Sequence, residues 1–164
     1  MNYASIRTCD IANGEGVRVS LFVSGCTHRC PGCFNEEAQA FDYGDRFVAG
    51  TEDYLLKALE PSHIAGLTLL GGEPMEPENQ RALVPFLRRL REKFGRTKTV
   101  WVYTGCVLER DLLKSDRPSR WRTEVTDEFL ALSDVMVDGP FIEALKDISL
   151  RFRGSSNQRV IKLH

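Results

Sequence analysis

Three cysteines close together, Cys26, Cys30 and Cys33, constrain this chain more than any other feature of its sequence. A disulfide uses two thiols and leaves the third over, and thiols so close in one loop meet disulfide geometry poorly. Thiolates bind soft centres, namely zinc, copper(I) and iron–sulfur clusters. Structural zinc and ordinary iron–sulfur clusters take four protein ligands, and the sequence offers no obvious fourth ligand nearby. The spacing therefore predicts a metal centre with one corner reserved for a group that is not protein.

Size and composition set the frame for this centre. The chain has 164 residues, and we expect residues 1–164 to form a single domain with a substantial core. A formal net charge of −1 argues against a nucleic-acid partner or an anionic membrane surface. No secretory signal and no apolar run of membrane-spanning length stand out. Five cysteines in such a chain predict a cytoplasmic protein whose clustered thiols are ligands or redox groups.

Apolar runs alternate with amphipathic patterns along the chain. We expect strands over 17–23, 67–70, 99–103 and 135–137, with possible edge-strand residues at Tyr3 and Ile6. We expect helices over 52–59, 79–94, 108–114 and 127–132. Pro85 falls inside the second of these, and implies a later start or a kink.

This alternation predicts parallel βαβ units joined by right-handed crossovers. The units are too few for a closed eight-fold barrel. We therefore expect an α/β fold, an open partial (βα) barrel with a mostly parallel curved sheet of about five or six strands. The cysteine loop and Gly71-Gly72-Glu73-Pro74 each follow a strand, and the carboxyl ends of parallel strands share one edge.

Cys-x3-Cys-x2-Cys after the first strand, with Gly-Gly-Glu-Pro after the second, resembles the radical S-adenosylmethionine (SAM) superfamily. Within it, the chain resembles the activating proteins of glycyl-radical enzymes, and most of all the activators of the anaerobic (class III) ribonucleoside-triphosphate reductase. Three further segments carry this resemblance: Gly16-Val17-Arg18, Cys30-Pro31-Gly32-Cys33-Phe34-Asn35, and Arg-Phe-Arg-Gly-Ser-Ser-Asn-Gln-Arg at 151–159. The resemblance extends from about Ile6 to Ile161 and implies a radical SAM core.

The resemblance implies one [4Fe-4S] cluster per chain, with SAM as the second cofactor. Cys26, Cys30 and Cys33 would bind three of the irons, and the amino and carboxylate groups of SAM would chelate the fourth. No side chain is expected to act as a general acid or base, because the cofactors carry the chemistry.

The remaining contacts to SAM follow from the same resemblance. Gly71 and Gly72 would allow backbone groups to approach its methionyl end, where Glu73 would help to hold the ammonium group. The residues around Cys33, namely Gly32 and Phe34, would contact the adenosyl part. Gly32 stands where many superfamily members carry an aromatic residue that stacks on adenine. Phe34 is a candidate for that surface, and a place in the core is the alternative.

The implied activity is that of a radical SAM oxidoreductase. Reductive cleavage of SAM at the cluster would give a 5′-deoxyadenosyl radical, which takes a hydrogen atom from a glycine of the large reductase subunit. A one-electron donor such as flavodoxin would be the second partner. Nothing in the chain looks like a second substrate domain, so a small activator of this kind would need a large client protein as its substrate.

Two other functions remain open. One is a radical SAM enzyme for a small molecule, similar to 7-carboxy-7-deazaguanine synthase. The other is a zinc-binding module that takes its fourth ligand from elsewhere, and its candidates are His28, His63, Cys9 and Cys106. In the favoured interpretation, His28 faces solvent, and Cys9 and Cys106 are small buried side chains. Asp138 either lines the cofactor site or forms a turn.

Overall fold

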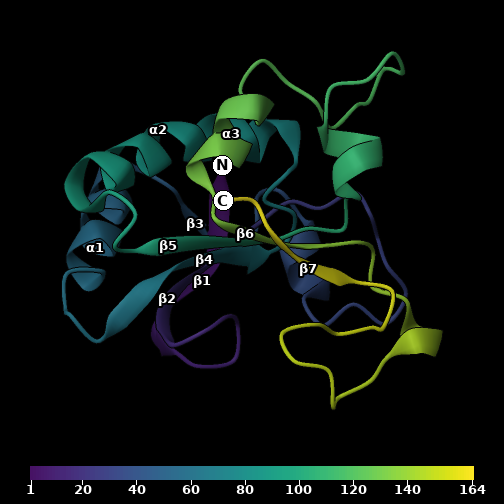
Figure 1. Ribbon diagram of the computed structural model, residues 1–164, viewed down its shortest axis with the longest axis horizontal. Helices are drawn as coiled ribbons and strands as arrows, with labels where there is room; N and C mark the ends of the chain where they lie inside the picture. Colours follow the sequence, from purple (N-terminus) through teal and green to yellow (C-terminus); the bar gives the residue numbers. More distant parts are fainter.

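A seven-stranded sheet runs through the molecule in the order β3-β1-β2-β4-β5-β6-β7 (Figure 1). The structure is a computed structural model that describes residues 1–164. Its strands are β1 (Asn2–Asp10), β2 (Val17–Val23), β3 (Asp45–Arg46), β4 (Ile64–Gly71), β5 (Thr99–Tyr103), β6 (Val135–Asp138) and β7 (Arg159–Lys162). Its α-helices are α1 (Ala49–Ala58), α2 (Pro77–Phe94) and α3 (Thr126–Leu132).

The sheet is mixed, so the expected open partial barrel with a mostly parallel sheet of about five or six strands is wrong. Strands β2, β4, β5 and β6 are parallel neighbours, whereas β1 pairs antiparallel with β2 and β3, and β7 pairs antiparallel with β6. The α/β character is retained. A short turn joins β1 to β2, which permits only an antiparallel pair, because a parallel neighbour needs a long crossover.

The two faces of the sheet have different roles because side chains alternate along a strand. Val19 and Leu21 of β2 point into the hydrophobic core, where they join residues of α1, α2 and α3. Phe22 and Leu70 point to the opposite face and line a cavity. The helices thus cover one face, and the other is left for the site.

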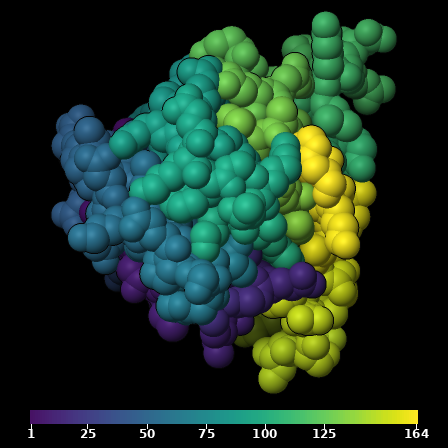
Figure 2. All heavy atoms as spheres, turned by 60° about the vertical axis from the view of Figure 1, so that its left-hand side comes forward, coloured from purple at the N-terminus to yellow at the C-terminus, as the bar shows by residue number.

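Helix α2 begins at Pro77, whose missing N–H costs nothing in the first turn. It continues through the exposed Pro85 and ends at Gly95, where φ is +56°. The sequence left open whether the helix starts after Pro85 or is kinked there, and the first of these alternatives is not observed. Figure 2 shows α2, in teal, across the middle of one face of the molecule.

The connection from β6 to β7, residues 139–158, borders the cavity. Its only helical part is a 3-10 turn, Glu143–Leu145, and Phe141, Lys146 and Phe152 line the cavity. Figure 2 shows part of this segment, in yellow-green, projecting at the lower edge of the molecule. None of the helices is both long enough and apolar enough to cross a membrane.

Candidate metal and cofactor site

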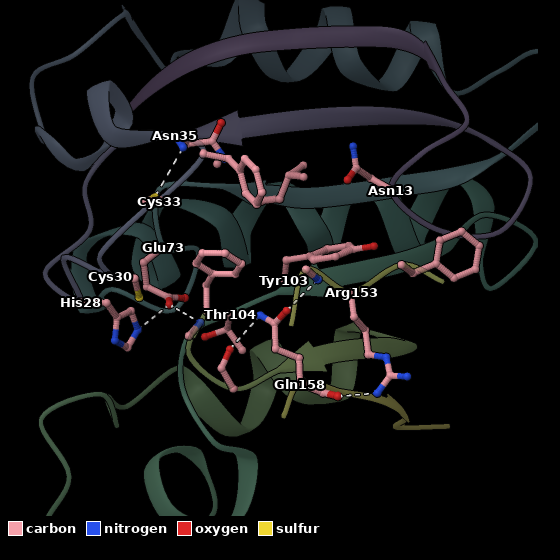
Figure 3. A pocket seen from close by; sticks show the side chains of 18 of the residues that line it. Asn13, His28, Cys30, Cys33, Asn35, Glu73, Tyr103, Thr104, Arg153 and Gln158 are labelled. Atoms are coloured by element: carbon pink, nitrogen blue, oxygen red, sulfur yellow. Dashed lines mark hydrogen bonds and ion pairs between the residues drawn. The ribbon is translucent and has the colours of Figure 1, made fainter. Parts of the chain in front are cut away.

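A cavity of about 620 Å³ lies at the carboxyl ends of the central parallel strands. It brings together the two motifs and the ends of two further strands (Figure 3). Its lining includes Cys26, Cys30 and Cys33 after β2, Gly71, Gly72 and Glu73 at the end of β4, Tyr103, Thr104 and Gly105 at the end of β5, and Gly139 and Phe141 after β6. A cavity of this size suits a cofactor.

The cysteine loop presents three free thiols to this cavity. Cys26, Cys30 and Cys33 are all partly exposed, and none forms a disulfide. Positive φ angles at Arg29 (+51°) and Gly32 (+72°) turn the backbone between them. The backbone N–H of Cys33 donates to the carbonyl of Cys30 at 3.2 Å. Three free thiols at one cavity fit a metal cluster bound at three corners.

The thiols nearest the protein interior are neutral unless a cation binds them. Burial raises the pKa of Cys26 to about 12, and the nearby Glu73 carboxylate adds to this effect. Burial also raises the pKa of Cys30. A coordinating metal reverses this preference and deprotonates a thiol outright. These sulfurs are therefore suited to a strongly positive centre.

The two glycines of the second motif meet the protein's own backbone. A Cβ on Gly72 would lie 2.6 Å from the carbonyl oxygen of Gly25 and 2.8 Å from that of Ala38. A Cβ on Gly71, where φ is +108°, would lie 2.7 Å from backbone atoms of Val23. The N–H of Gly72 donates to the Val23 carbonyl at 2.7 Å. Glycine is needed here so that the end of β4 can pack against the segment that leads into the cysteine loop.

The Glu73 carboxylate is buried and fully hydrogen-bonded. Its Oε1 accepts the N–H of Met75 at 2.8 Å, and its Oε2 accepts the N–H of Gly105 at 2.8 Å. The same Oε2 lies 2.7 Å from Nε2 of His28, a contact drawn in Figure 3. The backbone N–H of Glu73 donates to the carbonyl of Gly25 at 2.8 Å. Glu73 therefore links the ends of β4 and β5 to the cysteine loop.

The sequence predicts that His28 faces solvent, but its side chain is only 15% exposed. Its ring stacks on Trp121, with 4.4 Å between ring centroids and 17° between the planes. Arg120 lies over the same indole, with its guanidinium carbon 4.0 Å from the ring centroid. Sequence reasoning missed Trp121. It stands among Arg117, Arg120 and Arg122, and no motif marks it.

Other candidates are distributed around the cavity in different ways. Phe34 is 67% exposed at the rim, and its ring lies 5.3 Å from that of Phe141, so it is not a core residue. Asp138 is buried and does not line the cavity; its carboxylate accepts from Arg159 and from the N–H of Leu108.

The leftover cysteines and histidine also differ from one another. Cys9 is exposed, contrary to expectation, whereas Cys106 is buried as expected. Burial raises the pKa of Cys106, and its Sγ lies 3.9 Å from Nε2 of His28. The atoms of His28, Glu73 and Cys106 that could bind a metal ion thus lie within 4.8 Å of one another. Hydrogen bonds already occupy both carboxylate oxygens of Glu73. Exposed His63 does not line the cavity.

Comparison with known proteins shows the family to which the chain belongs. A domain family described as "4Fe-4S single cluster domain" matches residues 12–161. Three relatives are each named anaerobic ribonucleoside-triphosphate reductase-activating protein. That of Pasteurella multocida is 40% identical over 99% of this chain and 98% of its own length. That of Escherichia coli K12 is 39% identical (98% and 97%), and that of Enterobacteria phage T4 is 36% identical (98% and 93%). The resemblance seen in the sequence is confirmed: the chain belongs to the family of anaerobic ribonucleoside-triphosphate reductase-activating proteins and contains a 4Fe-4S single-cluster domain.

Proposed function

We propose that this protein activates an anaerobic (class III) ribonucleoside-triphosphate reductase by generating a glycyl radical in it, and that residues 1–164 act as one radical SAM domain. One observation carries the proposal: three free thiols and the Gly-Gly-Glu turn line the same cavity. When bound there, a [4Fe-4S] cluster and SAM would supply reductive cleavage of the sulfonium to a 5′-deoxyadenosyl radical, which takes a hydrogen atom from a glycine of the client.

In this proposal the chain's residues hold and orient the two cofactors. Cys26, Cys30 and Cys33 bind three irons and leave the fourth without a protein ligand. The carboxylate of Glu73 is engaged by Met75, Gly105 and His28, and its backbone N–H donates to Gly25, so in this proposal Glu73 shapes the turn that lies beside the methionyl end of SAM. Neighbouring backbone at Gly71 and Gly72 lines the same part of the cavity.

The rim near the third cysteine takes the adenosyl part. Gly32 has no side chain, and its φ of +72° keeps the turn tight beside Cys33. Phe34 offers an exposed ring at this rim. It is the aromatic surface against which we place adenine, since Gly32 supplies none.

Apolar walls suit a radical reaction. Phe22, Leu70, Phe141 and Phe152 line part of the cavity and offer no polar group to a bound cofactor. The client's glycine segment must reach the same cavity, and a one-electron donor such as flavodoxin must deliver its electron to the cluster.

The test is to mix the anaerobically loaded protein with SAM, a reductant and a candidate anaerobic reductase. We expect an electron paramagnetic resonance (EPR) signal of a glycyl radical on the reductase, and 5′-deoxyadenosine in equal amount. Cys30→Ser should abolish both, and Cys9→Ser, which changes an exposed cysteine outside the cavity, should leave both intact. Deoxyadenosine formed equally well without the reductase would favour a small-molecule substrate. Zinc in place of iron would overturn the proposal.

A further inference from the structure

We propose that His28 is a positioning residue for the cluster: Glu73 and Trp121 hold its ring from two directions, and so fix the turn that carries Cys26 and Cys30. This inference rests on the proposed function of those cysteines as iron ligands. It assigns a role to a side chain and to a distant tryptophan that the family's metal motif does not include.

The first support is the carboxylate on one edge of the ring. Nε2 of His28 lies 2.7 Å from Oε2 of Glu73. Glu73 is only 1% exposed, and the backbone N–H groups of Met75 and Gly105 fix its two oxygens. The carboxylate is therefore a rigid acceptor, and it determines where the imidazole can point.

The second support is the indole against the face of the ring. Trp121 stacks on His28 at 4.4 Å, and its backbone carbonyl accepts the side-chain amide of Gln80 from α2 at 2.7 Å. Arg120 covers the indole and donates to the Thr27 hydroxyl at 2.9 Å. The segment around Trp121 is thus attached both to α2 and to the cysteine loop.

These contacts are concentrated on the first half of the loop. Oε1 of Glu76 accepts both the N–H and the hydroxyl of Thr27, at 2.8 and 2.5 Å. Beyond His28, the side chains of Arg29 and Pro31 are exposed. Side-chain contacts from other elements therefore fix the loop between Cys26 and Cys30 through Thr27 and His28, whereas the turn before Cys33 is closed by the backbone hydrogen bond from Cys33 to Cys30.

Groups that orient metal ligands without binding the metal have measurable effects. Their loss typically costs about 10–100-fold in metal affinity or activity. Loosening His28 should therefore free the Cys26–Cys30 turn and change how firmly iron is held. It should also change the electronic environment of the cluster, which a purely structural role would leave alone.

The experiment compares two changes that each remove one support. His28→Gln keeps a hydrogen-bonding side chain for Glu73 but removes the stacked ring, and His28→Phe keeps a ring for Trp121 but removes the hydrogen bond. His63→Gln is the matched control, because His63 is exposed and outside the cavity. For each anaerobically loaded protein we would measure the rate of iron release to a chelator and the EPR spectrum of the reduced cluster.

We expect both His28 variants to release iron at least about tenfold faster than wild type, with an altered EPR spectrum, and His63→Gln to match wild type. Wild-type release and an unchanged spectrum in both His28 variants would overturn the inference. If a His28 variant fails to fold, variants of Trp121 provide the test. Trp121→Ala should release iron about tenfold faster than wild type, and Trp121→Phe should release it at nearly the wild-type rate. Equal rates in these two variants would overturn the inference. Failure of the wild-type protein to hold any cluster would instead refute the proposed function.

Discussion

At the scale of single residues, the three cysteines of the cysteine loop differ from the other two because they line the cavity. Each of the substitutions Cys26→Ser, Cys30→Ser and Cys33→Ser should reduce the iron and sulfide content to near background after anaerobic reconstitution. The reason is that each would remove one of the three proposed ligands. The matched change is Cys9→Ser, at an exposed position on β1 outside the cavity. Metal analysis checks this, and a full cluster in any one of the three variants would contradict the ligand assignment.

Gly72 offers a second prediction, because its neighbours are backbone atoms that cannot move aside. Gly72→Ala would place a Cβ 2.6 Å from the Gly25 carbonyl oxygen, and overpacking of this kind costs about 1–3 kcal/mol. Since Gly25 directly precedes Cys26, iron content should fall as well. Thermal unfolding and metal analysis would test both effects.

The control for this change is Gly50→Ala in α1. A Cβ on Gly50 would meet nothing within 4 Å, and alanine is the better helix former. Its stability should be unchanged or slightly higher, and its iron content normal. Equal losses in both variants would show that a general intolerance of substitution, not the contact with Gly25, explains the effect.

The sequence predicts the cavity residues that belong to motifs, and misses those that belong to none. Cys26, Cys30 and Cys33 form one short motif, so their chemistry can be recognised from spacing alone. The support for His28 comes from Trp121, which is distant in sequence and belongs to no motif. Only the folded chain brings that indole to the cysteine loop, and no periodic pattern marks it.

At the scale of elements, the same division explains the error in the fold. The strands 17–23, 67–70, 99–103 and 135–137 were predicted closely, because buried strands read as apolar runs. The directions of the edge strands were not predicted. Strand β1 mixes polar and apolar residues without strict alternation and has mostly partly buried or exposed side chains, and β7 is largely exposed. Neither carries the signal that would distinguish a parallel addition from an antiparallel one.

Besides its backbone pairing with β6, β7 is held by one buried carboxylate. Asp138, 1% exposed, accepts Nε of Arg159 at 2.9 Å and the N–H of Leu108 at 2.9 Å. Asp138→Asn removes the charge and one acceptor, and hydrogen bonds to charged groups contribute about 1.5–3 kcal/mol. We therefore expect the free energy of unfolding to fall by about 1–3 kcal/mol, as measured by denaturant unfolding.

The matched change is Glu124→Gln. Its partner is Arg81, and both side chains are more than half exposed, so the ion pair contributes little, about 0–1 kcal/mol. A loss for Glu124→Gln as large as that for Asp138→Asn would show that burial does not determine the strength of these pairs.

At the scale of the whole molecule, buried aspartates determine how the fold responds to acid. Burial alone would raise the pKa of Asp134, but hydrogen bonds from Arg91 and the N–H of Val100 outweigh it, and the net pKa is lowered. Asp10 follows the same pattern through Asn13 and Ser20. A carboxyl group whose folded pKa lies below its unfolded value of about 3.9 stabilises the fold above that pH. This stability is lost as the pH falls through the folded pKa.

A direct check compares wild type with Asp134→Asn across a range of pH. Between about pH 5.5 and 8 the variant should unfold at a lower temperature by a constant margin. Below about pH 4 the margin should shrink, because the wild-type carboxyl group becomes protonated too. Since both proteins carry the same cysteines, any acid loss of the cluster affects them equally. A margin that stays constant down to pH 3 would contradict the assignment.

The segment between β6 and β7 offers a prediction that relates ligand binding to the dynamics of the molecule. Lys146 and Arg151 are exposed in this segment, while Phe141 and Phe152 line the cavity. Cleavage by trypsin requires local opening of such a segment, and a ligand bound only to the closed form opposes opening. Saturating SAM should therefore slow cleavage at Lys146 and Arg151 of the cluster-loaded protein by about tenfold or more. Lys114, exposed and outside the cavity, provides the internal control and should be cut at an unchanged rate. Mass spectrometry of the fragments measures both cleavage rates in one reaction. Equal protection of Lys114 would contradict the prediction, because it would mean that SAM stabilises the whole fold instead of holding this segment closed over the cavity.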